Sequence, residues 1–146
     1  MEVRDQEQWR ALFHGYRSFY EFAPDEQIVD TVWGWLMDAG HEEQALVAVN
    51  AEGRVAAIAH YRRFARPSVG RAALFLDDLF TDVELRGQGI ARLLLERLQE
   101  IASAEDLAGV RWFTGEQNLT AQALYNQLAV RLPFYAYEMP PAMASE

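Results

Sequence analysis

The sequence contains no cysteine, so the chain has no disulfide, no thiolate ligand for a metal and no thiol for a covalent acyl-cysteine intermediate. It also lacks a long apolar run. Charged residues or histidine interrupt every hydrophobic stretch before the roughly 18 residues that a membrane-spanning helix needs. The N-terminus, MEVRDQEQWR, is too polar for a signal peptide. We therefore expect a cytoplasmic protein without a membrane partner.

Basic residues are few compared with acidic ones: 13 Lys and Arg face 22 Asp and Glu, for a formal net charge of −9. Nonspecific nucleic-acid binding depends on basic patches that neutralise phosphates, and no such cluster is present. We therefore expect no nucleic-acid partner, and a DNA- or histone-directed modifier is the weaker alternative. An acidic surface favours the approach of cationic small molecules, although the same charge is compatible with plain solubility.

The chain has the size and composition of one globular domain. Its 146 residues are 51% hydrophobic and 24% charged, which is ordinary for a folded protein. No internal repeat, low-complexity tract or linker divides it. We expect a single domain over residues 1–139 and a disordered tail over residues 140–146.

The spacing of apolar residues predicts an α/β domain with a mixed sheet, in the order ααβββαβαβ. Helical spacing alternates with short β-prone runs that are separated by turn-forming residues. The helices are expected over residues 9–20, 28–36, 90–104 and 119–128, and the strands over residues 45–49, 55–64, 72–80, 110–113 and 134–139.

A glycine-rich turn, Arg86-Gly87-Gln88-Gly89-Ile90-Ala91, lies between the third strand and the helix over 90–104. Glycines let the backbone approach a ligand, and the first turn of a helix presents unpaired N–H groups with partial positive charge. The turn lacks the third glycine of G-x-G-x-x-G, and no G-K-S/T follows it. The pattern therefore indicates an anion site of another kind, with a purely structural turn as the alternative.

This turn resembles the Q/R-x-x-G-x-G/A signature of the GNAT superfamily of N-acetyltransferases, with Arg86, Gly89 and Ala91 at the defined positions. The resemblance implies a single-domain fold whose mixed, mostly antiparallel sheet is flanked by helices. It also implies acetyl coenzyme A as co-substrate, and we expect no metal. The implied cofactor-binding residues are Leu79, Phe80 and Thr81 for the pantetheine arm, and Arg86, Gly87, Gln88, Gly89, Ile90, Ala91 and Arg92 for the pyrophosphate.

A second motif, N-x-x-A-x-x-L-Y, runs from Asn118 to Tyr125 and resembles the fourth motif of the same family. The resemblance implies that Tyr125 protonates the departing coenzyme A thiolate, a role that suits a phenol with a pKa of about 10. Asn118 is a candidate helix cap, a coenzyme contact, or both. The usual continuation Y-x-x-x-G-F is absent, because Ala129 stands at the glycine position, so the helix exit must differ.

Two adjacent acids, Asp77 and Asp78, lie in the third strand, and we expect their side chains to point to opposite faces. The stretch Leu76-Asp77-Asp78-Leu79-Phe80 resembles that of the spermidine/spermine N-acetyltransferase branch, which implies Asp77 as a base, acting directly or through water. Structural hydrogen bonds are the alternative. The resemblance places the acceptor-binding helix at Tyr16, Tyr20 and Glu21, which together with Asp78 are the candidate substrate-binding residues. Packing in the core is the alternative for Tyr16.

The sequence therefore predicts an N-acetyltransferase that acetylates a primary amine of a small, cationic substrate by direct transfer in a ternary complex. The alternative is a noncatalytic acyl-CoA sensor. Polyamine, amino acid, aminoglycoside and peptide amine all stay open as acceptors, and analogy with similar proteins admits a homodimer. His14, His41 and His60 have no metal-ligand spacing and receive no catalytic role.

Overall fold

The computed structural model describes residues 1–144, and the chain forms two compact units, Met1–Phe113 and a smaller one that begins at Thr114. The larger unit contains α1 (Gln6–Phe19), α2 (Glu26–Met37), β1 (Gln44–Val49), β2 (Val55–Arg66), β3 (Arg71–Thr81), α3 (Ile90–Ala104) and β4 (Val110–Trp112). The smaller unit contains α4 (Leu119–Leu128).

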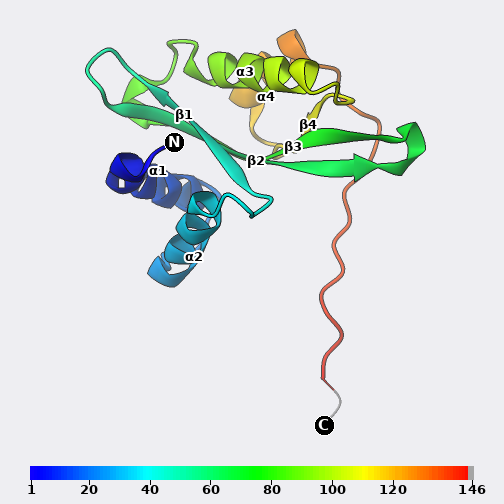
Figure 1. Cartoon of the computed structure of the whole chain (residues 1–146), viewed down its shortest axis with the longest axis horizontal. Coiled ribbons are helices and arrows are strands. Elements are labelled where there is room, and N and C mark those ends of the chain that lie inside the picture. Colours follow the sequence, from blue (N-terminus) through cyan, green and yellow to red (C-terminus); the bar gives the residue numbers. More distant parts are fainter. Residues whose placement is uncertain (145–146) are drawn as a thin grey trace. The chain divides into compact units, whose positions relative to one another are not determined.

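The sheet in the larger unit has the order β1-β2-β3-β4. The pairs β1–β2 and β2–β3 are antiparallel, and the short β4 runs parallel to β3. This confirms the mixed, mostly antiparallel sheet. Figure 1 shows α1 and α2 on one face of this sheet and α3 on the other.

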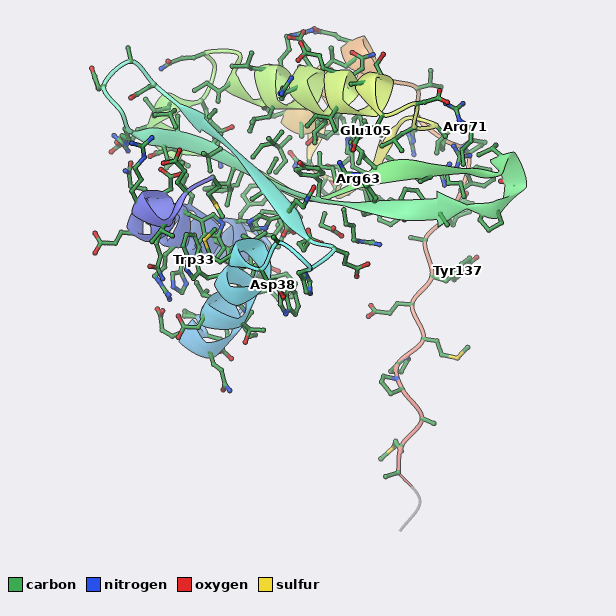
Figure 2. The ribbon with its side chains drawn as sticks, in the orientation of Figure 1. Trp33, Asp38, Arg63, Arg71, Glu105 and Tyr137 are labelled. Atoms are coloured by element: carbon green, nitrogen blue, oxygen red, sulfur yellow. The ribbon has the colours of Figure 1, made fainter. Side chains whose placement is uncertain are left out.

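The main core lies between the sheet and the first two helices. Trp9, Val29 and Ile58 come from α1, α2 and β2, and all three are fully buried. On the opposite face α3 buries Leu94, Leu98 and the neighbours that share their helical stripe. An ion pair between Arg63 of β2 and Glu105, at the end of α3, links this helix to the sheet at 2.5 Å (Figure 2).

The predicted last strand is wrong. Residues 134–139 form no strand, and Phe134 and Tyr137 are 76% and 94% exposed. A strand needs a neighbouring edge for its backbone N–H and C=O groups, and within residues 1–144 no strand pairs with this segment. Pro133 and Pro140 also remove backbone donors at both of its ends.

Residues 140–144 of the predicted tail contain no helix or strand, whereas residues 145–146 lie outside the described part of the chain. Of the helices described over residues 1–144, none has both the length and the apolar character required to cross a membrane.

The Phe80 ring approaches α1 so closely at Gly15 that a larger residue would not fit there. A Cβ at this position would lie 2.8 Å from Cε1 of the Phe80 ring, whereas the exposed Gly34 of α2 has nothing within 4 Å of its own Cβ position. We expect Gly34→Ala to stabilise the protein by about 0.5–1 kcal/mol, because alanine loses less backbone entropy in a helix.

The matched Gly15→Ala change gives the same gain in helix propensity, but its Cβ forces the Phe80 ring to move. We therefore expect the Gly15→Ala variant to be less stable than the Gly34→Ala variant. Chemical unfolding of the two variants beside the wild type measures the difference. Equal stabilisation by both changes would contradict the proposed packing of Gly15 on Phe80.

Candidate functional site

A β-bulge in the middle of β3 shapes the candidate site. His60 pairs with Asp78, but the next residue of β2, Tyr61, pairs with Leu76, so Asp77 is the extra residue. The Oδ2 atom of Asp78 lies 2.8 Å from His60 Nδ1, and Asp77 accepts from Arg62 Nε at 3.1 Å. Since residues two apart in β2 share a face, both carboxylates reach the side on which α1 packs.

This arrangement corrects the expectation that Asp77 and Asp78 point to opposite faces. Strict alternation holds only where the strand pairing is regular, and the bulge interrupts it at this point. Both acids therefore lie close enough to Tyr16 and to Glu43 to influence the pKa values of these two side chains.

Tyr16 of α1 lies beside this acid pair. Its hydroxyl donates to the Asp77 backbone oxygen at 3.5 Å. Burial raises the pKa of the Tyr16 phenol, and the charge of Asp78 and a hydrogen bond to it raise this pKa further. The phenol is therefore a permanent hydrogen-bond donor near neutral pH. The ring of Tyr20 packs 4.8 Å from that of Tyr16.

Glu21, the other candidate on this segment, is exposed and adopts the left-handed backbone conformation, with φ of 61°. Within residues 1–144 it forms no hydrogen bond or ion pair with the two aspartates. The structure thus brings together Tyr16, Tyr20, Asp77 and Asp78 and leaves Glu21 apart from this contact network.

Glu43, which the sequence did not single out, completes the group from the segment before β1. The pKa of its carboxyl is raised to about 8, mainly by burial. A hydrogen bond to Asp77 and the charges of Asp77 and Asp78 raise this pKa further, whereas the charge of Arg62 lowers it. Its backbone N–H donates to His41 Nδ1 at 3.0 Å. We call Glu43, Asp77 and Asp78 the acidic cluster.

His60 was also missed. It is 1% exposed in β2 and lies between two partners: Trp9 Nε1 donates to its Nε2 at 2.8 Å, and its Nδ1 faces Asp78. The mostly apolar run Val55–Tyr61, which is buried throughout, could have indicated that His60 is buried, but its partners come from α1 and β3, far along the chain. Within residues 1–144 no group of three or more acidic or histidine side chains could hold a metal ion.

The glycine-rich turn follows β3. Gly87 and Gly89 have φ of 79° and 78°, a left-handed conformation that glycine adopts without strain. Gly89 is the N-cap of α3 and supplies no side chain to its first turn, so the first amides of α3 are available to an anion. Arg86 donates from Nε to the Thr81 backbone oxygen at 3.2 Å, and its guanidinium lies 5.2 Å from the centroid of the Phe80 ring.

The end of β3 has a free strand edge. Leu79, Phe80 and Thr81 pair with β2 on one side, but β4 pairs only with Leu74–Leu76 on the other. Within residues 1–144 no strand covers the β4 side of residues 77–81. An extended ligand could therefore pair with this main chain as an added strand does.

In the smaller unit, Asn118 caps α4, because its side chain accepts from Ala121 N at 3.4 Å. This confirms the capping role. Tyr125 lies seven residues further along α4 and is half-buried. Two helical turns separate the two residues, so they share a face of α4. The helix ends before Ala129, whose backbone is already extended.

Comparison with known proteins identifies the class. The model of the acetyltransferase (GNAT) family matches residues 9–129. The D-amino-acid N-acetyltransferase HPA3 of Saccharomyces cerevisiae is 24% identical over 139 residues, which cover 94% of this chain and 86% of the yeast protein.

Solved structures show the same fold. The ribosomal-protein-alanine N-acetyltransferase of Brucella melitensis has a TM-score of 0.77 at 21% identity, and the alignment covers 96% of each chain. A tetramutant of the BH1408 protein of Bacillus halodurans has a TM-score of 0.79 at 20% identity, with 97% of each chain covered. The protein described here belongs to the acetyltransferase (GNAT) family, and it is therefore an acyltransferase whose family uses acetyl coenzyme A.

The raised pKa of Glu43 generates a pH-dependent stability. In the folded protein this carboxyl keeps its proton up to about pH 8, whereas the unfolded carboxyl ionises near 4.5. The folded state binds more protons between these values, so the stability contribution of Glu43 falls as the pH rises from about 4.5 to about 8 and changes little above that. Glu43→Gln cannot ionise, and we expect its Tm to exceed that of the wild type by several degrees at pH 8.5 and by less at pH 5.

Thermal unfolding at both pH values measures this difference, with Glu42→Gln as a control at the exposed neighbouring position. A Tm difference between Glu43→Gln and the wild type that stays constant from pH 5 to pH 8.5 would show that folding does not raise the pKa of Glu43.

Proposed function

We propose that this protein transfers the acetyl group of acetyl coenzyme A to the primary amine of a small, cationic substrate, by direct transfer in a ternary complex. The observation that carries the proposal is the acidic cluster, which gathers three carboxyls around one positive side chain, Arg62, near the free edge of β3. A cationic amine is the ligand that such a surplus of acid attracts.

The proton on the amine is the main chemical obstacle. An alkylammonium with a pKa of about 10.4 must lose a proton before its nitrogen can attack a thioester. Asp77 is the proposed acceptor of this proton, directly or through water, and Asp78 the proposed ammonium partner. Tyr16 and Tyr20 would line the same site, with Glu21 at its exposed rim.

The coenzyme would bind along β3 and the glycine-rich turn. The main chain of Leu79, Phe80 and Thr81 would pair with the pantetheine arm, and the amides of residues 87–92 with Arg86 would hold the pyrophosphate. The free edge of β3, the left-handed glycines and the uncapped start of α3 support this assignment. Asn118 and Tyr125 would serve the thiol end, where Tyr125 protonates the leaving thiolate. Family membership supports that role.

Two kinds of acceptor have specific support. The Leu76–Phe80 stretch resembles the spermidine/spermine branch and favours a polyamine. The yeast relative is named for D-amino acids and favours an α-amino acid. Arg62 also supports an α-amino acid as acceptor. Its Nε donates to the Asp77 carboxylate, and within residues 1–144 its Nη atoms have no hydrogen-bond partner. A guanidinium presenting these atoms could bind a carboxylate.

The first test is release of coenzyme A thiol from acetyl coenzyme A across polyamines, amino acids of both hands, aminoglycosides and peptides. The chain has no cysteine, so it adds no thiol background. We expect turnover with one class and a loss of about 10²–10⁴-fold in kcat/KM for Asp77→Asn, as for removal of a general base.

Glu96→Gln, an exposed change on α3, is the matched control and should retain full activity. Tight acetyl coenzyme A binding without thiol release for any amine would overturn the proposal and indicate a noncatalytic acyl-CoA sensor.

The role of Tyr125 has a separate test. Tyr125→Phe removes the proton donor and keeps the ring, so we expect kcat to fall about 10²-fold or more while acetyl coenzyme A affinity is unchanged. Tyr135→Phe changes a tyrosine that is 87% exposed and serves as the control. Steady-state kinetics and direct coenzyme titration provide the two readouts. Equal kcat values for both variants would exclude Tyr125 as the acid.

A further inference from the structure

We propose that His60 is a positioning residue for Asp78: the buried Trp9 indole fixes the His60 tautomer, and His60 then holds the Asp78 carboxylate toward the substrate amine. The inference rests on the proposed function, in which Asp78 binds the ammonium. It assigns a task to a buried imidazole that the acetyl-transfer steps themselves do not use.

The direction of each hydrogen bond follows from the donor-only character of indole. Trp9 Nε1 carries a hydrogen and cannot accept, so His60 Nε2, 2.8 Å away, must accept. A neutral imidazole with an accepting Nε2 carries its hydrogen on Nδ1. That hydrogen points at Asp78 Oδ2, also at 2.8 Å. Trp9, His60 and Asp78 thus form a chain with one consistent set of proton positions.

Burial makes this chain stiff. Trp9 and His60 are 0% and 1% exposed, and the Phe13 ring packs against the imidazole with a centroid distance of 5.0 Å. A buried hydrogen bond has no competing water, so each partner keeps its orientation. Asp78 is the outer member, with its side chain 22% exposed. The chain therefore runs from the core to the edge of the acidic cluster.

Among residues 1–144, the charged and titratable groups that contact the Trp9–His60–Asp78 hydrogen-bond chain lie at its Asp78 end. Tyr16 from α1, Asp77 from β3 and Glu43 from the segment before β1 face Asp78, while Arg62 of β2 pairs with Asp77. Around the imidazole itself the described contacts are the rings of Trp9 and Phe13 and the Asp78 carboxylate.

The Trp9–His60–Asp78 hydrogen-bond chain restricts where the amine proton can go. His60 cannot take a proton from the amine on Nδ1, which already bears hydrogen, or on Nε2, which accepts from Trp9. A proton leaving the amine stays with the carboxylates or passes to water. His60 holds Oδ2 of Asp78 and leaves the rest of that carboxylate to Tyr16 and the ammonium.

The tautomer is directly measurable. The protein has three histidines, so the imidazole nitrogen resonances of His60 can be assigned by comparison with His14→Gln and His41→Gln. We expect the Nδ1–H pattern for His60 at pH 7.5. Trp9→Phe alone leaves the Asp78 carboxylate as acceptor for Nδ1–H and should keep this pattern, whereas Trp9→Phe together with Asp78→Leu removes both partners and should release His60 to the Nε2–H tautomer or to exchange between the two. An Nε2–H pattern for His60 in the wild type would overturn the proposal.

Kinetics separates positioning from mere packing. We expect His60→Leu to lower kcat/KM for the amine about 10- to 100-fold, the effect of one hydrogen bond to a charged group, with the KM for acetyl coenzyme A nearly unchanged. His60→Asn keeps an N–H donor near the Nδ1 position and should recover most of this loss. If both folded variants lose the same activity, or neither loses any, the positioning role is wrong.

Folding is checked by thermal unfolding. His60→Leu leaves the Trp9 indole without its acceptor, so the double variant Trp9→Phe, His60→Leu, in which both polar partners are apolar, serves as a second form of the test. The nitrogen resonances need no turnover. A wild type that acetylates no amine would therefore disprove the proposed function, while the tautomer still decides the arrangement around His60.

Discussion

The arrangement of the acidic cluster depends on the β-bulge at Asp77. One extra residue in β3 interrupts the alternation of its side chains, so two neighbouring carboxylates meet the same helix and the same strand. In a regular strand one of the two would face α3 instead. Burial is the main cause that raises the pKa of Glu43 and of Tyr16, and the negative charge that the bulge places beside α1 raises both pKa values further.

Two further features of β3 place an open strand edge and a glycine-rich turn after this charge in the chain. The strand continues past the last residue that β4 pairs with, so the main chain of Leu79–Thr81 is open on one side. It then leads into left-handed glycines and the start of α3, where unpaired amides carry partial positive charge. The strand β3 and the segment after it therefore carry, in chain order, an acidic surface suited to a cation, an edge suited to an extended ligand and a turn suited to an anion.

The core explains how the acidic surface can be held firmly. Trp9 is fully buried among aromatic rings of α1 and α2, yet its indole needs an acceptor, and His60 is that acceptor. Satisfying the indole leaves the other imidazole nitrogen directed at Asp78. A polar requirement of the core is thus met by a side chain that also orients an acid at the surface.

Features that depend on local spacing were predictable from the sequence. The helical stripe of α3, the glycine-rich turn before it and the Asn118 cap of α4 involve residues a few positions apart, so their physics is contained in short segments. The features that only tertiary structure decided depend on distant pairing. The segment over residues 134–139 has strand-like composition, but no strand in the described part of the chain pairs with it, and the bulge at Asp77 arises from the register with β2. Glu43 and His60 reach Asp77 and Asp78 only because separate strands meet there, and a hydrogen-bond partner so far along the chain leaves no periodic signal in the sequence.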